Sequence, residues 1–310
     1  MKYLVTGGAG FIGSHVVDRL LFSGNEVVVV DNFNDYYDPI VKHSNLKGAS
    51  KNPNFKLYEC DILDFEKIRE IFAQEKFDRV IHLAARAGVR PSIKYPQLYM
   101  DVNVKGTTNI FELCRQFGIK DIVFASSSSV YGCNTKIPFC EDDDVSKQIS
   151  PYAVSKRACE LLASCYHNLY GLNITGLRFF TVYGPRGRPD MAPYMFMKKI
   201  MAGETIERYG DGSTQRDYTF IFDIVDGIIA SIGHNGIFNL GNNNPVSLTE
   251  FIATIEKVTW CKAKIIEKPM QEGDVPITYA SLEKSSKVLD YKPKVDLEEG
   301  LTELYKWMKK

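Results

Sequence analysis

The first 180 residues alternate short apolar runs with longer segments of helical periodicity. The apolar runs are nearly continuous, which is typical of strands buried on both faces of a parallel sheet. They cover residues 3–5, 26–30, 55–58, 79–83, 121–125 and 173–177, and the helical patterns cover residues 11–22, 64–74, 97–117 and 151–169. Because parallel strands need crossover helices, this order predicts an α/β fold with a doubly wound, Rossmann-type parallel sheet.

The pattern changes after about residue 180. Glycines and prolines at positions 184–189 mark a loop, and turn-forming residues follow at 210–213 and 239–245. The elements between these turns are shorter than those of the first part. We therefore expect residues 181–310 to form a smaller C-terminal α/β domain, with later segments returning to the sheet of residues 1–180.

Composition narrows the classes of function. Lys plus Arg and Asp plus Glu both number 38, so the chain lacks the basic excess of a nucleic-acid-binding protein. The seven cysteines show no zinc-type spacing, which indicates reduced thiols, no metal and a cytoplasmic location. No apolar stretch approaches the ~20 residues of a membrane span. We expect neither nucleic acid nor membrane as a partner.

A glycine-rich turn joins the first strand to the first helix, with the pattern Gly7-x-x-Gly10-x-x-Gly13. Glycines there allow a sharp turn and let the backbone approach a pyrophosphate, which the amino terminus of the helix then faces. Asp31 ends the second strand about twenty residues further on, where a carboxylate can accept from both ribose hydroxyls and would repel a 2′-phosphate. The pattern therefore favours NAD over NADP; the alternative is a tight turn with a capping carboxylate.

Two further strand ends carry candidate cofactor contacts. Asp61 and Ile62 follow the third strand and could bracket an adenine, although a simple turn explains them equally well. The fourth strand ends in His82 followed by Leu83, Ala84 and Ala85, and small residues there let the backbone pass close to a cofactor. We interpret His82 itself as a packed core residue rather than a catalyst.

A tyrosine and a lysine at positions 152 and 156 share one face of the predicted helix over 151–169. A neighbouring ammonium favours the phenolate, so Tyr152 can serve as a general base. Such a pair alone is common on protein surfaces, and its weight comes from following the fifth strand. Ser127 lies where that strand ends, so its hydroxyl can bind a substrate oxygen, unless it only caps a polar loop.

Together these motifs resemble, in order and over essentially all 310 residues, the extended short-chain dehydrogenase/reductase family. The resemblance implies that Ser127, Tyr152 and Lys156 are catalytic. It implies an NAD site made by Gly7, Gly10, Phe11, Ile12, Gly13, Asp31, Asn32, Asp61, Ile62, Leu83, Ala84, Ala85, Tyr152 and Lys156. Residues 1–180 would then bind NAD, and residues 181–310 would bind a UDP-sugar.

Within that family, epimerisation fits the serine run best. Dehydratases usually carry Asp-Glu after the catalytic residue and UDP-glucuronate decarboxylases usually carry a Glu in the same segment, whereas Ser128 and Ser129 stand here. Segments 31–37, 87–90 and 178–192 resemble the UDP-glucuronate 4-epimerases, and Thr181 stands where UDP-galactose 4-epimerases usually have Asn. The open alternatives are a UDP-glucose/UDP-galactose 4-epimerase, a decarboxylase and a catalytically silent NAD-binding protein.

The resemblance also implies substrate contacts from Arg90, Ser127, Ser128, Tyr152, Thr181, Arg188, Arg216 and Asp274. We expect Ser127, Ser128 and Thr181 to cradle a C6 carboxylate. Arg188 would hold that carboxylate or close the site, unless it forms only a loop ion pair, and Arg216 would meet the diphosphate. Asp274 belongs to a segment that closes over the nucleotide.

Members of this family usually pair two helices from each subunit into a four-helix bundle, so the resemblance implies a homodimer. The candidate helices here are those predicted over 97–117 and 151–169. They carry Ile110, Leu113, Leu161 and Leu162, which could equally be core residues.

Overall fold

The computed structural model describes residues 1–269 and 275–310, which divide into two compact units. The first unit comprises Met1–Asn134, Glu141–Phe179 and Val225–Phe238, and the second comprises Thr135–Cys140, Phe180–Ile224 and Asn239–Lys310. A late segment thus returns to the first unit, and the short stretch Thr135–Cys140 belongs to the second.

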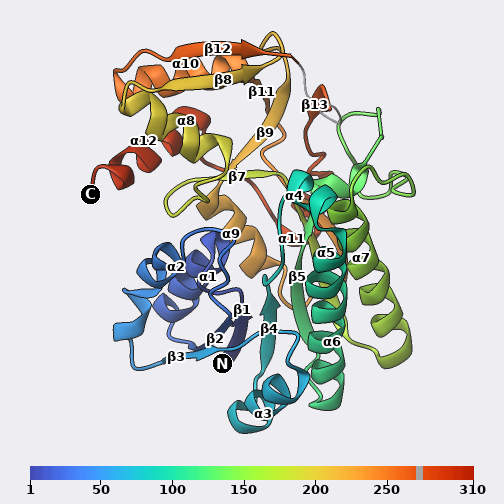
Figure 1. The fold of residues 1–310 in the computed structure, drawn as a ribbon. Helices are drawn as coiled ribbons and strands as arrows, with labels where there is room; N and C mark the ends of the chain where they lie inside the picture. Colours follow the sequence, from blue (N-terminus) through green and yellow to red (C-terminus); the bar gives the residue numbers. More distant parts are fainter. Residues whose placement is uncertain (270–274) are drawn as a thin grey trace. The chain divides into compact units, whose positions relative to one another are not determined.

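A seven-stranded sheet forms the centre of the first unit, with strand order β10-β6-β5-β4-β1-β2-β3 (Figure 1). Its strands are β1 (Lys2–Thr6), β2 (Glu26–Asp31), β3 (Phe55–Glu59), β4 (Arg79–His82), β5 (Asp121–Ser127), β6 (Asn173–Phe179) and β10 (Gly236–Leu240). Strands β1 to β6 pair in parallel. The predicted doubly wound α/β fold is confirmed.

Helices cover both faces of this sheet. They include α1 (Phe11–Phe22), α2 (Pro39–Leu46), α3 (Phe65–Glu75), α4 (Val89–Lys94), α6 (Gly106–Gln116), α7 (Pro151–Tyr170) and α9 (Ile221–Ala230). Apolar side chains of α3, α6 and α7 pack with those of the strands in one continuous core, which explains the uninterrupted apolar strands of the sequence. On the other face, α1 packs on β1 and β2 and forms an ion pair with α9 through Arg19 and Asp226.

The single helix predicted over 97–117 is wrong in detail. The chain instead forms α5 (Pro96–Tyr99), a π-helical turn (Met100–Lys105) and α6. Asn103 lies in the π-helical turn with only 1% of its surface exposed, and its side chain bonds to the backbone of another segment. A π-helical turn of this kind often accompanies a functional site, because it re-aims side chains that a regular helix would misplace.

The second unit is a smaller α/β assembly, also as predicted. Its strands are β7 (Thr181–Tyr183), β8 (Thr205–Tyr209), β9 (Gln215–Phe220), β11 (Pro245–Ser247), β12 (Lys264–Lys268) and β13 (Ile277–Thr278), and its helices are α8 (Ala192–Met201), α10 (Leu248–Thr259), α11 (Glu283–Leu289) and α12 (Leu297–Met308). Strand β9 pairs with β7, β11 and β13, and β8 pairs with β12.

Asp217 of β9 organises the second unit. It is fully buried and accepts hydrogen bonds from the backbone amides of Asn242, Asn243 and Ala280, at 2.6 to 3.1 Å. These bonds fix the loop before β11 and the segment after β13 against β9. A buried carboxylate with this many donors is stabilised by them, since leaving it unpaired would be costly.

Among the described residues, no helix has the length and apolar character needed to cross a membrane. The same residues contain no group of three or more His, Cys, Asp or Glu side chains that could hold a metal ion.

Candidate active site

The glycine turn after β1 is built so tightly that side chains are excluded from it. Gly7 has φ of +70°, and a Cβ atom there would lie 2.6 Å from the amide nitrogen of Ala84. A Cβ atom on Gly13 would lie 2.2 Å from the carbonyl oxygen of Gly7. Gly10 differs, because its Cβ atom would meet only that same carbonyl oxygen, at 3.2 Å. Gly7 and Gly13 are therefore required by the protein's own packing, whereas a Cβ atom on Gly10 needs only a shift of a few tenths of an ångström in the Gly7 carbonyl.

The amino terminus of α1 fits an anionic ligand. Gly10 caps the helix without a side chain, and no acidic residue lies in the first turn. The amides of Phe11, Ile12 and Gly13 have no acceptor within the helix, because the carbonyls four residues earlier lie outside it. Free amides together with the positive end of the helix dipole favour a phosphate group.

Asp31 ends β2 beside this turn and is 7% exposed. Its Oδ1 accepts from the amide of Phe33 at 2.9 Å, and its Oδ2 accepts from the amide of Ala9 at 3.1 Å. Burial raises the pKa of Asp31, although these amides and the nearby Lys42 oppose that rise. Each carboxylate oxygen keeps lone pairs that a ribose hydroxyl could use. The carboxylate thus also shapes the glycine turn, a role that the sequence did not reveal.

The structure brings two of the predicted adenosine contacts together. Asn32 Nδ2 donates to Asp61 Oδ2 at 2.7 Å, so these side chains lie together after β2 and β3. Ile62, by contrast, belongs to the hydrophobic core, and its side chain packs against Gly106.

The end of β4 is held by a buried polar chain. His82 Nδ1 lies 2.6 Å from Thr6 Oγ1, and its Nε2 lies 3.0 Å from Thr107 Oγ1. Burial, with a smaller effect of Lys156, lowers the pKa of His82 to about 3, so the ring is neutral. His82 is a packed core residue. The amide of the next residue, Leu83, donates to the carbonyl of Thr6 and so holds Leu83, Ala84 and Ala85 next to the glycine turn.

The three predicted catalytic residues come from β5 and α7. Ser127 ends β5, is 8% exposed, and accepts from the amide of Ser129 at 3.1 Å. Helix α7 begins at Pro151, capped by Ser150, so Tyr152 lies in its first turn and Lys156 one turn later. Lys156 Nζ donates to the carbonyl oxygen of Ala125 at 2.8 Å and thereby ties the helix to the strand.

Two side chains that the sequence did not single out position this region. Asn103 binds both the amide and the carbonyl of Arg86, at 2.7 and 3.0 Å, and donates to Ser155 Oγ at 2.9 Å. The buried ring of Tyr99 lies edge-on to Tyr152, with centroids 6.1 Å apart. No pattern in the sequence set Asn103 apart from the other polar residues around it.

The remaining predicted substrate residues are spread over both units. In the first unit, Ser128 follows Ser127 in a 3₁₀ turn, and Arg90 is exposed on α4. In the second unit, Thr181 opens β7 and pairs with β9.

The two predicted substrate arginines of the second unit have protein partners. Arg188 forms an ion pair with Asp190, at 2.5 Å, which is the loop pairing that the sequence left open. Arg216 Nη1 donates to the carbonyls of Gln215 and Val275, each at 2.8 Å. Asp274 lies outside the described residues.

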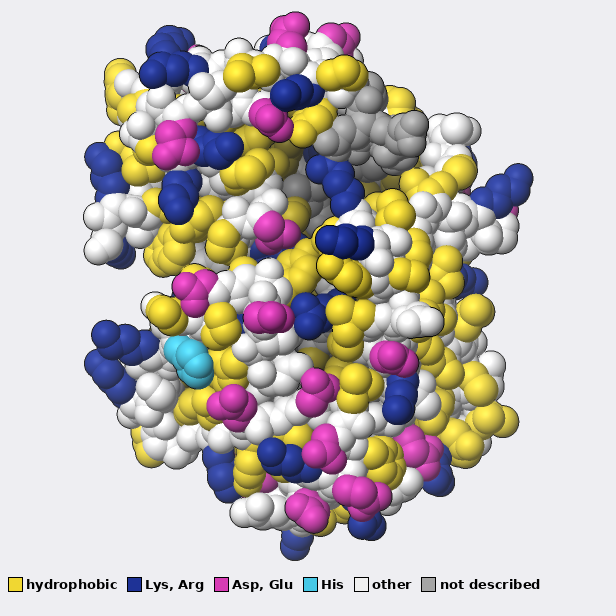
Figure 2. All heavy atoms as spheres, viewed as in Figure 1, with side chains coloured by type: hydrophobic (Ala, Val, Ile, Leu, Met, Phe, Trp, Pro, Cys, Tyr) yellow, Lys and Arg dark blue, Asp and Glu magenta, His cyan; other side chains and the backbone are white. Residues whose placement is uncertain are grey.

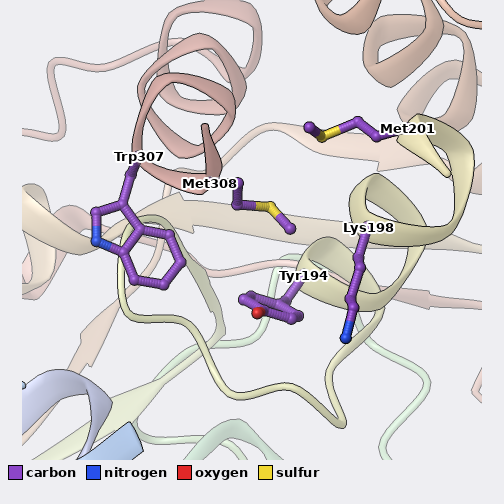
Figure 3. A pocket seen from close by; sticks show the side chains of 5 residues that line it. All are labelled: Tyr194, Lys198, Met201, Trp307 and Met308. Atoms are coloured by element: carbon purple, nitrogen blue, oxygen red, sulfur yellow. The ribbon is translucent and has the colours of Figure 1, made fainter. Parts of the chain in front are cut away.

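A cavity of about 280 Å³ lies on the second unit between α8 and α12 (Figure 3). Tyr194, Lys198, Met201, Trp307 and Met308 line it, and none of these is a predicted site residue. The rings of Tyr194 and Trp307 meet edge to face, with centroids 6.2 Å apart.

Comparison with known proteins decides the family. Residues 3–241 match the model of the NAD dependent epimerase/dehydratase family. The chain belongs to this family. Among relatives of this epimerase-family chain, an uncharacterised protein of Methanocaldococcus jannaschii is 49% identical over 99% of the chain and 97% of its own length. A UDP-glucuronate 4-epimerase of Thermodesulfobacterium geofontis is 45% identical, over 99% and 96% of the two chains.

Solved structures that resemble this chain are also nucleotide-sugar epimerases. A UDP-glucuronic acid 4-epimerase from Bacillus cereus, in complex with UDP-glucuronic acid and NAD, is 35% identical with a TM-score of 0.92, covering 100% of this chain and 99% of the other. A UDP-glucose 4-epimerase from Thermotoga maritima, with UDP-glucose, is 32% identical with the same TM-score and coverage. The protein is thus an NAD-dependent nucleotide-sugar epimerase, and the predicted cofactor is confirmed.

The glycine turn yields a prediction for NAD binding. Gly10→Ala should weaken NAD binding about tenfold or more, because the added methyl group stands on the residue that caps α1, directly before the bare amides, while the Gly7 carbonyl oxygen 3.2 Å away has to shift by only a few tenths of an ångström. Gly48→Ala is the matched control, since a Cβ atom there meets nothing within 4 Å. Titration calorimetry on NAD-stripped protein measures affinity, and calorimetric melting should place both variants within about 5 °C of the parent. Equal NAD affinity in Gly10→Ala and Gly48→Ala would contradict this assignment.

Proposed function

We propose that the protein interconverts UDP-glucuronate and UDP-galacturonate through a 4-keto intermediate. The observation that carries the proposal is the end of β5, where a serine run faces the helix with Tyr152 and Lys156 and offers no acid for elimination. Ser126 of this run bonds to the carboxylate of Glu160, which is buried and also engaged by Arg157 and Arg178. An elimination would need a further acid and base.

The chain's own residues would divide the chemistry. Tyr152 takes the proton of the C4 hydroxyl and later returns one to the ketone oxygen, and Ser127 donates a hydrogen bond to that oxygen. Lys156 stabilises the phenolate of Tyr152 and binds the nicotinamide ribose. The bound NAD supplies hydride acceptance and return. Between these events the keto-sugar turns so that its other face is presented.

The uronate is favoured by the named relatives and by Thr181. Oxidation at C4 of a uronate makes a β-keto acid that readily loses carbon dioxide, so the carboxylate must be held out of the decarboxylating geometry. We propose that Ser127, Ser128 and Thr181 hold it, with Arg188 exchanging its partner Asp190 for the substrate. Arg216 and Asp274 would contact the UDP portion of the substrate, and Arg90 would be a further substrate contact.

A second candidate is 4-epimerisation of UDP-glucose and UDP-galactose. The similarity to the Thermotoga maritima UDP-glucose 4-epimerase favours it, since its TM-score equals that of the glucuronic acid enzyme.

Product analysis separates these reactions. Purified protein is incubated with UDP-glucuronate without added NAD, and the products are resolved by ¹H NMR, with UDP-galactose in a parallel tube. Formation of UDP-galacturonate supports the proposal and shows that NAD is retained. A UDP-pentose would mean decarboxylation, and conversion of UDP-galactose alone would assign the neutral-sugar reaction.

The carboxylate cradle predicts the behaviour of Thr181. Thr181→Ala should raise KM for UDP-glucuronate about tenfold or release a UDP-pentose side product, because a hydrogen bond to a charged group is lost. Thr181→Ser keeps the hydroxyl and should behave like the parent. If Thr181→Ala gives parent kinetics and clean product, Thr181 has no part in holding the carboxylate.

We also propose a homodimer formed through α7. Ile110 and Leu113 are fully buried in the core and cannot form an interface, whereas Leu161 is 57% exposed. Val154 and Leu169 are exposed on the same helix, and Figure 2 shows hydrophobic side chains gathered over α7 at the right of the view. An apolar helix surface of this kind is typical of subunit contacts.

Leu161→Asp should therefore shift the protein from dimer to monomer, because a carboxylate would be buried in the contact. Phe22→Asp is the control, since Phe22 is 91% exposed at the end of α1. Sedimentation velocity measures the oligomeric state. A dimer that survives Leu161→Asp, or one that dissociates equally in Phe22→Asp, would place the interface elsewhere.

A further inference from the structure

A buried ionic cluster lies directly behind the predicted catalytic residues. Arg178 of β6 binds Glu160 of α7 through two hydrogen bonds, of 2.9 and 3.0 Å, and both side chains are at most 2% exposed. Ser126 of β5 donates to the same carboxylate at 2.6 Å. Arg157 completes the set from the partly exposed side of α7, at 2.9 Å. The cluster therefore joins two adjacent strands to one helix.

This cluster and Lys156 form two successive hydrogen bonds between α7 and β5. Lys156 binds the backbone of Ala125, and Glu160, one helical turn later, binds the side chain of the next strand residue, Ser126. Ser127 follows immediately, and its Oγ accepts from the amide of Ser129 in the turn that begins there. The position of Ser127 relative to α7 is thus transmitted through residues 125 and 126.

The hydrogen bond from Ser126 to Glu160 is a strong one. Burial raises the pKa of Glu160, but Arg178 and Ser126 more than offset that rise and lower it below its usual value. The carboxylate is therefore ionised at neutral pH, and a hydroxyl donating to a buried carboxylate forms a short, charge-assisted bond. Arg178 also lies over the ring of Tyr131, 4.8 Å from its centroid, so the turn after Ser127 is held by the same cluster.

We propose that Ser126 is a positioning residue, whose hydrogen bond to the Glu160–Arg178 pair sets Ser127 against Tyr152 and Lys156. Ser126 is not a substrate ligand in this account, although it belongs to the same serine run. Without its hydroxyl, the strand end loses its side-chain bond to Glu160 and keeps the bond from Lys156 to Ala125 and the contact of Arg178 with Tyr131, so it can shift along α7. The inference rests on the proposed function only in taking Ser127, Tyr152 and Lys156 as the reacting set.

Ser126→Ala tests this, because it removes one hydroxyl and leaves the buried ion pair intact. A displacement of about 1 Å at a reacting group can cost up to 100-fold, so kcat should fall about tenfold or more, while KM stays within about twofold. Ser126→Thr keeps the hydroxyl and should restore kcat. Ser231→Ala is the matched control, since Ser231 is fully buried and donates to a helix carbonyl at 2.8 Å.

Hydrogen exchange supplies a readout that needs no turnover. Peptides covering residues 124–131 and 151–157 should exchange faster in Ser126→Ala than in Ser231→Ala, with other peptides unchanged. The parent and both variants are assayed on the same UDP-sugar. A wrong substrate assignment would leave the parent itself without turnover, whereas a failure of the Ser126 proposal would leave the parent active and Ser126→Ala equal to it. Parent-like kcat in Ser126→Ala, or exchange equal to that of Ser231→Ala in both peptides, would overturn the proposal.

Discussion

The attachment of α7 to the end of β5 is the constraint on which the rest of the site depends. Lys156 binds the carbonyl of Ala125, and Glu160 binds the hydroxyl of Ser126, so a helix and a strand meet with a fixed register. Tyr152 in the first turn of that helix and Ser127 at the end of that strand inherit their positions from these bonds. A pair of side chains can act on one oxygen only if the elements that carry them do not slide.

The same edge of the sheet gathers the predicted cofactor contacts, because the parallel strands all end there. Packing dictates Gly7 and Gly13, while the bare amides after Gly10 are what a phosphate requires. Asp31 contributes both to packing and to the predicted cofactor site. Its carboxylate accepts from two amides of the turn and keeps lone pairs for a ribose hydroxyl. In the second unit, Asp217 plays a comparable role by fixing the segments next to Arg216. Buried carboxylates thus order the backbone on which the proposed ligand contacts stand.

The sequence was sufficient to predict the features that depend on residues close together along the chain. The strand–turn–helix with its glycines, the carboxylate after β2 and the spacing of Tyr152 and Lys156 are all set within about twenty residues. Asn103 and the Glu160–Arg178 pair were missed, because their partners lie on other elements and no spacing rule connects them. The helix predicted over 97–117 was wrong for the same reason, since tertiary bonds accompany its π-helical turn. Ile62, an apolar residue after β3, packs in the hydrophobic core, which its position after a strand did not predict.

The central assignment is Tyr152, in the first turn of α7, as the group that transfers the proton of the substrate hydroxyl. The most direct measurement compares the parent with Tyr152→Phe for kcat on UDP-glucuronate, together with NAD content and substrate affinity. We predict that Tyr152→Phe retains NAD and binds UDP-glucuronate within a few-fold of the parent, while kcat falls ~100-fold or more. Turnover close to that of the parent, with NAD retained, would contradict the assignment and move the chemistry away from this helix.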